Sequence, residues 1–309
     1  MERELVRYLC ERLPAHPRLL LGPGDDAAIL RLPERANLVA TTDMLMDGVD
    51  FLLGQHDVEK IGRKALAVNL SDLAAMAAVP LAALVSVSLP RRGGESLAKQ
   101  LYEGMLPLAA EFDCPVAGGD TNSWDGPLVI CVTALGVVPP ERRWRRSGAL
   151  VGDVILVTGE FGGSILLKQF DFTPRVADAL WLAEHSTVHA ALDVSDGLSL
   201  DLARLCEASG CGALLDLAEI PVAAAARQLA EQLRDGSTPL DHALADGEDF
   251  ELILVVPPEA AEVLLANQPL ATRLTRIGEI TTEAGLRAMD DEGQIRTVAA
   301  RGYEHRLDS

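Results

Sequence analysis

Acidic residues beside glycine, serine or threonine recur at the ends of predicted strands. Small residues let a ligand approach the backbone, and α/β proteins build their sites on such loops. If the loops converge, their carboxylates need cations among them to stay ionised together. Mg²⁺ prefers oxygen ligands and substrate phosphates, so the pattern predicts a nucleotide phosphate bound through magnesium, with bridging metals assisting phosphoryl transfer. The stretches are Gly22-Pro23-Gly24-Asp25-Asp26, Thr41-Thr42-Asp43, Ser71-Asp72, Gly118-Gly119-Asp120-Thr121 and Asp193-Val194-Ser195-Asp196-Gly197.

Asp72 stands in the most apolar context of these acids. It belongs to the stretch Asn69-Leu70-Ser71-Asp72-Leu73-Ala74-Ala75-Met76, and residues 73–89 contain no charge. A carboxylate beside a large apolar surface is costly unless it is paired or ligates a cation. We therefore expect Asp72 to meet a metal, an arginine or backbone donors. The alternative is a helix cap, in which Ser71 or Asp72 begins a helix over 73–78.

The sequence does not support other known phosphate-binding or catalytic motifs. The chain has no G-x-x-x-x-G-K-[ST] motif and no EF-hand loop, which argues against a P-loop protein and against calcium storage. Residues 22–27 formally match a dinucleotide-binding fingerprint, but 28–32 then read as a strand instead of a helix. No Ser-His-Asp arrangement is readable. Arg146, beside Ser147-Gly148, is the one arginine we single out as a phosphate contact.

Composition narrows the class of protein. The net charge of −19 argues against nucleic acid or an anionic membrane as a partner. The five cysteines are odd in number and form no C-x-x-C, so neither a disulfide framework nor a zinc site is indicated. Residues 73–89 are nearly long enough to span a bilayer, but Pro80 interrupts them. Since residues 1–4 begin charged, without a signal peptide's apolar core, we expect a reduced, cytoplasmic protein.

The elements that must position these acids alternate between strands and helices. Their order predicts an α/β fold with mixed sheets. Pro139-Pro140 and the arginine-rich 141–146 read as a domain boundary, so the expected domains are 1–140 and 141–309. Strands are expected at 27–32, 38–42, 81–89, 128–138, 154–157, 213–217 and 252–256. Helices are expected at 4–13, 57–67, 95–112, 175–185, 198–208, 222–233 and 258–266, with a β meander after them.

Taken together, the motifs resemble the thiamine-monophosphate kinase family of the aminoimidazole ribonucleotide synthetase superfamily. The similarity spans essentially the whole chain, and the motifs fall in the family's order. It rests on Gly24-Asp25-Asp26-Ala27, Thr41-Thr42-Asp43, Asn69–Met76, Gly118-Gly119-Asp120-Thr121, Asp193-Val194-Ser195-Asp196-Gly197 and Gly247-Glu248-Asp249-Phe250-Glu251-Leu252.

The resemblance implies ATP-dependent phosphorylation of thiamine monophosphate to thiamine diphosphate. It implies a two-domain aminoimidazole ribonucleotide synthetase-like fold: an N-terminal domain that binds ATP and Mg²⁺ and forms a homodimer through its sheet, and a C-terminal domain that completes the active site. The implied metal ligands are Asp26, Thr41, Thr42, Asp43, Asp72, Asp120, Asp193 and Asp196. Tyr102, Gly119, Asp120, Arg146 and Ser195 would contact ATP, and Asp50, Glu248 and Tyr303 would face the thiamine substrate. Asp72, Asp120, Arg146 and Asp196 are the implied catalytic residues.

Two departures from the family pattern concern the phosphate acceptor. Asp50 stands where the family commonly has His, and another His is often found near Lys168-Gln169-Phe170. An acid next to an anionic acceptor should weaken its binding. An alternative is therefore a non-catalytic or altered-acceptor nucleotide-binding member of the superfamily. Hydrogenase maturation factors fit poorly, because the chain has no C-terminal cysteine. Selenophosphate synthetases also fit poorly, because the nearest cysteine ahead of a glycine-rich loop, Cys10, lacks the expected sequence context.

Overall fold

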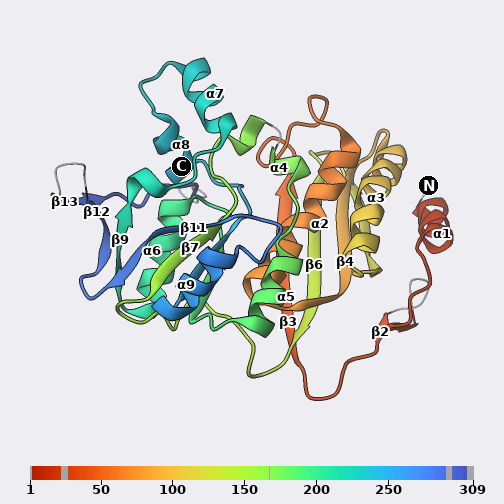
Figure 1. The fold of residues 1–309 in the computed structure, drawn as a ribbon. Coiled ribbons are helices and arrows are strands. Elements are labelled where there is room, and N and C mark those ends of the chain that lie inside the picture. The colour runs from red at the N-terminus through yellow and green to blue at the C-terminus, as the bar shows by residue number, and fades with distance from the viewer. Residues whose placement is uncertain (1, 22–26, 167, 290–293, 305–309) are drawn as a thin grey trace. The chain divides into compact units, whose positions relative to one another are not determined.

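The computed structural model describes residues 2–21, 27–166, 168–289 and 294–304 (Figure 1). The chain divides into two compact units. The first comprises residues 1–73 and 78–141, and the second comprises 74–77 and 142–309. Among the described residues, no helix is both long and apolar enough to cross a membrane.

The first unit is built on a four-stranded mixed sheet. Its strand order is β3 (Asn37–Met46), β6 (Val129–Val138), β4 (Val79–Pro90) and β5 (Val116–Trp124). β6 pairs antiparallel with β3 and β4, whereas β4 and β5 run parallel. A small ribbon of β1 (Leu19–Leu21) and β2 (Ile29–Leu30) precedes this sheet.

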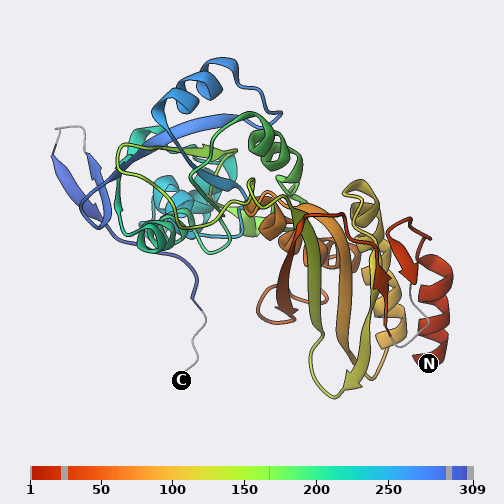
Figure 2. The same cartoon turned by 90° about the horizontal axis from the view of Figure 1, so that it is seen from below.

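Two long helices, α2 (Val58–Ala75) and α3 (Gly94–Glu111), cover one face of this sheet. Glycines allow them to touch: a Cβ on Gly62 would lie 2.0 Å from Leu101 O, and one on Gly104 would lie 1.8 Å from Glu59 O. α1 (Glu2–Arg12) lies beside α3 (Figure 2). Arg12 Nη2 donates to Glu103 Oε2 at 2.8 Å, which joins those two helices.

The second unit contains a seven-stranded sheet in the order β13-β12-β9-β11-β7-β10-β8. Among the strands that the structure describes there, β12 and β9 pair in parallel and all other neighbours pair antiparallel. The strands are β7 (Val154–Thr158), β8 (Ala190–Asp193), β9 (Gly212–Asp216), β10 (Leu252–Val256), β11 (Leu274–Thr281), β12 (Gly285–Met289) and β13 (Ile295–Val298).

Both faces of the central strands are buried, which explains their unbroken apolar sequences. Ile155, Val157, Ile253 and Val255 join a core with Leu198, Leu202 and Leu205 of α6. The unit's helices are α4 (Lys168–Asp171), α5 (Val176–His185), α6 (Leu198–Ser209), α7 (Ala224–Leu233), α8 (Pro239–Ala245) and α9 (Pro258–Asn267). Two short 3₁₀ turns lie at Ser164–Leu166 and Leu217–Glu219.

The structure confirms the α/β fold with mixed sheets and corrects several local predictions. α2 continues without a break through residue 75, so neither Ser71 nor Asp72 begins a helix. The predicted C-terminal meander is wrong, because β11 inserts between β9 and β7 of the large sheet. β5, β8 and α8 were not expected; β5 was missed because Gly118-Gly119 within it resembles a loop.

Candidate active site

Asp72, Thr41 and Asp43 meet in the first unit. Alternation along β3 directs Thr41 and Asp43 to the same face of the sheet. Asp72, in the last turns of α2, accepts a hydrogen bond from Thr41 Oγ1 and shares one with Asp43. Burial, followed by the charges of Asp72 and Asp50, raises the pKa of Asp43 to about 7. The two carboxylates therefore disfavour being ionised together in this environment.

Asp120 and Thr42 lie on the opposite face of that sheet. Asp120 lies beside Ser86 in the strand register, and Ser86 lies beside Cys131, whereas the row of Asp43 passes through Val85. Since successive side chains alternate between faces, Asp120 and Asp43 point in opposite directions. Within one copy of the chain, the first unit does not bring Asp120 to the Asp43–Asp72 pair.

Gly119 is required by close backbone contact. A Cβ on Gly119 would lie 1.8 Å from Val85 O on the neighbouring strand, so no other residue fits this position.

Tyr102 of α3 is buried, and this burial raises the pKa of its phenol to about 12. A cavity of about 540 Å³ follows Gly119 along β5, lined by residues 121–123 and by the start of α3 at Gly94-Glu95-Ser96. The nucleotide contacts of Gly119 and Tyr102 stay predictions.

Asp50 closes the turn that follows β3. Its Oδ2 accepts a hydrogen bond from Met46 N at 2.7 Å, and its carbonyl oxygen accepts one from Lys64 Nζ at 2.9 Å. The Asp50 carboxylate thus has a structural function in the first unit, and its charge also contributes to the raised pKa of Asp43.

Asp193 and Asp196 lie in the second unit, at the end of β8 and before α6. Asp193 is buried, whereas Asp196 is half-buried and forms an ion pair with Arg204 Nη1. The same Arg204 nitrogen donates to Asp201 Oδ1 at 3.0 Å. Asp201 Oδ2 accepts from Asp196 N at 2.9 Å and from Gly197 N at 3.1 Å, which fixes the start of α6.

Sequence reasoning missed both Asp201 and Arg204. The two residues are three positions apart on a helix that begins beside a predicted metal ligand. This spacing could have indicated that they interact.

Glu248 and Tyr303, predicted to face the thiamine substrate, both lie next to this loop. Glu248 N donates to Ser195 O at 2.7 Å, and Tyr303 N donates to Asp196 O at 2.9 Å. The tertiary structure therefore gathers four residues of the predicted site that are up to 108 positions apart, from Ser195 to Tyr303.

Asp249 and Glu251 form a second, buried acidic group in this unit that sequence analysis did not assign. Glu251 accepts two hydrogen bonds of 2.7 Å from Arg175, and Lys168 Nζ lies 3.4 Å from Glu251 and 3.5 Å from Asp249. Burial raises the pKa of Asp249 to about 7, against the opposing effects of Lys168 and Gly162 N. In the sequence, Asp249 and Glu251 formed part of the 247–252 motif, in which only Glu248 had a predicted role.

Arg146 is exposed in the second unit, and its carbonyl oxygen accepts a hydrogen bond from Ser209 Oγ at 3.0 Å. Its predicted phosphate contact stays a prediction.

The predicted metal ligands are divided between the two units, and Asp26 lies outside the described residues. Across the described part of the chain, no three acidic, histidine or cysteine side chains converge as a metal site. The donors in the Thr41–Asp43–Asp72 group are nevertheless all oxygens, and two of them are carboxylates that repel each other. This donor chemistry fits Mg²⁺.

Two family models match the chain. The AIR synthase related protein N-terminal domain matches residues 24–138, and the C-terminal domain of the same family matches residues 167–291. A curated relative, thiamine-monophosphate kinase of Rhodopirellula baltica, is 42% identical over 312 residues, which cover 99% of this chain and 97% of the relative.

Solved structures support the same family assignment. The crystal structure of thiamine-monophosphate kinase from Stenotrophomonas maltophilia has a TM-score of 0.78 and 34% identity, covering 92% of this chain and 94% of that one. AaThiL complexed with AMPPCP and TMP has a TM-score of 0.76 and 26% identity, covering 99% of this chain and 96% of that one. With its mixed-sheet fold and its acidic motifs in place, the chain belongs to the AIR synthase related proteins and, among them, to the thiamine-monophosphate kinase family.

Proposed function

We propose that this protein transfers a phosphoryl group from ATP to thiamine monophosphate, giving thiamine diphosphate. The observation that carries the proposal is the agreement between two independent findings. The chain aligns over 99% of its length with a relative complexed with AMPPCP and TMP. It also holds the paired carboxylates Asp43 and Asp72 that a metal-bound nucleotide phosphate requires.

The chemistry needs no general base from the protein. The acceptor is a phosphate with a second pKa near 6, so its oxygen is already a nucleophile at neutral pH. Catalysis then consists of alignment and of neutralising charge on the transferred group. In the proposed mechanism, Asp43, Asp72 and Thr41 would hold Mg²⁺ in the first unit. Asp193 and Asp196 would offer carboxylates to a cation in the second unit, and Thr42 and Asp120 stay predicted ligands on the opposite face of the first unit's sheet. Bound Mg²⁺ would neutralise negative charge on the phosphates.

Recognition of the substrates is divided among the remaining predicted residues. Arg146 would stabilise the transferred phosphoryl group, and Gly119, Tyr102 and Ser195 would position ATP. Glu248 and Tyr303 would bind thiamine monophosphate, supported by their backbone bonds to the 195–196 loop. The proposed domains are 1–140, which would bind ATP and Mg²⁺ and form the dimer, and 141–309, which would complete the active site.

A homodimer is part of the proposal. The face of the first unit's sheet opposite α2 and α3 exposes large apolar side chains: Leu38 is 53% exposed, Met44 59% and Leu84 36%. An exposed apolar sheet face of this kind marks an interaction surface. A second copy packed on it would lie against Thr42 and Asp120, which share this face. A cytoplasmic location is also proposed, supported by the use of ATP and by five free cysteines.

The second candidate is a non-catalytic or altered-acceptor member of the family, and Asp50 is the observation that favours it. Its acid adds negative charge close to Asp43. However, the Asp50 carboxylate accepts a hydrogen bond from Met46 N, so it stabilises the turn after β3. We therefore favour the kinase.

The decisive experiment measures conversion of ATP and thiamine monophosphate to thiamine diphosphate by chromatography, with and without Mg²⁺. Metal-dependent formation of thiamine diphosphate is the expected result. Binding of ATP without product would refute the proposed kinase and leave the second candidate.

A further inference from the structure

The backbone around Glu248 is held in a conformation that side chains disfavour. Glu248 has a φ of 54° and Phe250 a φ of 51°, both in the left-handed region, and Gly247 has a φ of 74°. Non-glycine residues occupy this region only where the surrounding structure holds them there, commonly at functional sites. One side of the loop is held by Ser195 O, which accepts from Glu248 N at 2.7 Å, and by Val194 O, which accepts from Phe250 N at 2.8 Å.

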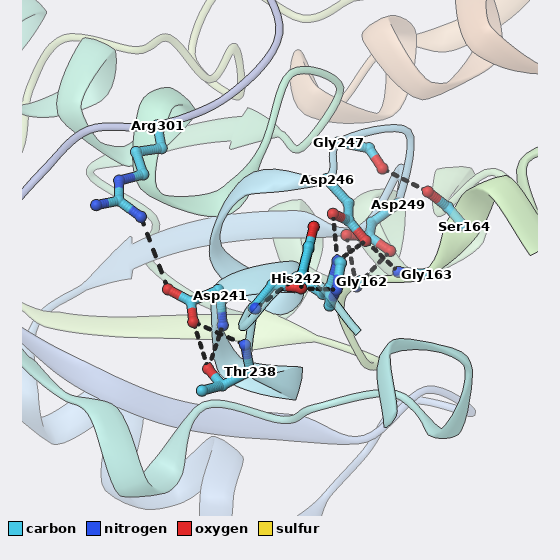
Figure 3. A network of polar contacts seen from close by, with 12 residues as sticks. Gly162, Gly163, Ser164, Thr238, Asp241, His242, Asp246, Gly247, Asp249 and Arg301 are labelled. Atoms are coloured by element: carbon cyan, nitrogen blue, oxygen red, sulfur yellow. Dashed lines mark hydrogen bonds and ion pairs between the residues drawn. The ribbon is translucent and has the colours of Figure 1, made fainter. Parts of the chain in front are cut away.

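The other side of the loop is fastened to a glycine turn. Gly162 N donates to both carboxylate oxygens of Asp249 at 3.0 Å, and Gly163 N donates to Asp246 Oδ2 at 2.8 Å. Ser164 Oγ donates to Gly247 O at 2.5 Å. We call these four bonds between residues 162–164 and residues 246–249 the glycine clamp (Figure 3). Glu248 lies between residues that the clamp holds on both sides.

The glycine turn packs closely against its neighbours, which leave no space for a side chain at Gly162 or Gly163. A Cβ on Gly162 would lie 2.6 Å from Ala243 N, and one on Gly163 would lie 2.3 Å from the carbonyl carbon of Ala225. Both glycines also have a positive φ, of 89° and 75°. The turn therefore packs against α7 and α8. From this position its backbone N–H groups and the Ser164 hydroxyl donate hydrogen bonds to residues 246–249.

His242 supports the clamp from α8. Its side chain is largely buried, with Nδ1 2.9 Å from Asp246 Oδ1 and Nε2 2.9 Å from Ser237 Oγ. Because one Asp246 oxygen faces His242 and the other accepts from Gly163 N, the carboxylate is fixed between a helix and the glycine turn. Figure 3 shows this arrangement at one end of α8 and Asp241 at the other end.

We propose that the glycine clamp, through Asp246, Asp249 and Ser164 with His242 behind them, sets the orientation of Glu248 for binding thiamine monophosphate. These side chains are positioning residues, and the inference rests on the proposed kinase function. Loosening the clamp should release the backbone at residues 247–250 and weaken acceptor binding, whereas the ATP and metal contacts of the first unit stay unchanged.

The test compares Asp246→Ala with Asp241→Ala. Both residues are aspartates of the same α8 segment. Asp241, however, exchanges hydrogen bonds with the cap residue Thr238 and forms an ion pair of 3.7 Å with the exposed Arg301, away from the clamp. The KM for thiamine monophosphate should rise at least tenfold in Asp246→Ala, with the KM for ATP within twofold of wild type. Asp241→Ala should leave both values within twofold, although the loss of its cap lowers the melting temperature.

Further variants keep the test decisive. If Asp246→Ala does not fold, Ser164→Ala removes a single bond of the clamp and should give the same selective rise in KM. Asp246→Asn retains an acceptor for Gly163 N and should recover part of the acceptor affinity. An unchanged KM for thiamine monophosphate in folded Asp246→Ala or Ser164→Ala, or equal effects on both KM values, would overturn the inference. Wild-type protein that forms no thiamine diphosphate would instead reject the proposed function.

Discussion

Asp43 and Asp72 share a hydrogen bond, although one lies on β3 and the other near the end of α2, 29 positions later. Burial, and then repulsion by Asp72 and Asp50, raise the pKa of Asp43 to about 7, so a cation bound between the carboxylates would favour their ionised forms. Both residues belong to the first unit, and this pair is where we propose that a cation binds.

Asp72→Asn should remove most of the turnover and leave the fold intact. An asparagine can still accept from Thr41 Oγ1, but it removes one negative charge from the pair. We expect kcat to fall on the order of 10²–10³-fold, as for the loss of one electrostatic contact to a transition state, and the pKa of Asp43 to fall. Steady-state kinetics and circular dichroism check this. Asp57→Asn is the matched control, because Asp57 begins the same helix and accepts from Glu59 N at 2.9 Å. Wild-type turnover in Asp72→Asn would disprove the metal assignment.

Arg204→Ala should destabilise the metal-free protein more than the protein in Mg²⁺. Arg204 neutralises Asp196 and Asp201, and its removal leaves both carboxylates without that cation. We expect a loss of about 2 kcal/mol without metal, below the range for fully buried pairs because Asp196 is partly exposed. Mg²⁺ bound at Asp196 should restore part of this stability. Thermal unfolding with and without Mg²⁺ measures the difference, and equal destabilisation under both conditions would contradict a cation at Asp196.

Asp249 should make the stability of the protein fall as pH rises. Its pKa is raised from 3.8 to about 7 in the folded state, so between these values the native state binds more protons than the unfolded chain. The unfolding free energy should therefore decrease by about 3 kcal/mol between pH 5 and pH 8 from this group.

The measurement compares wild type with Asp249→Asn by denaturant unfolding at both pH values, in saturating Mg²⁺ so that Asp43 contributes little. The asparagine can accept from Gly162 N but cannot ionise, so its stability should change less with pH. The same pH dependence in both proteins would show that Asp249 titrates normally.

Met44→Asp should convert the proposed homodimer into a monomer. Met44 is 59% exposed on the open face of the first unit's sheet, and a buried charge there would oppose packing of a second copy. Light scattering after size-exclusion chromatography reports the mass. Val263→Asp serves as the control, since Val263 on α9 is 60% exposed but belongs to the second unit. A dimer that survives Met44→Asp would place the interface elsewhere.

Much of the fold could be predicted from local patterns. The apolar runs at 154–157 and 252–256 predicted β7 and β10, and Gly210 predicted the end of α6, where it adopts a left-handed conformation. α8 was missed because its capping box at Thr238 and Asp241 lies among turn-forming residues. α2 was cut short because Ser71 and Asp72 have the sequence signature of a cap, whereas packing of Leu70 and Leu73 carries the helix past them.

The sequence by itself determined which residue types could do the chemistry: acids beside small residues, in the order of a known family, with no competing phosphate motif. Only the tertiary structure decided which of them meet. It joined Asp43 to Asp72, placed Asp120 on the other face of the same sheet, and brought Arg204 to Asp196. The physical reason is that the side chains of a strand alternate between faces, and long-range pairing sets the register; neither can be read from the spacing of a single motif.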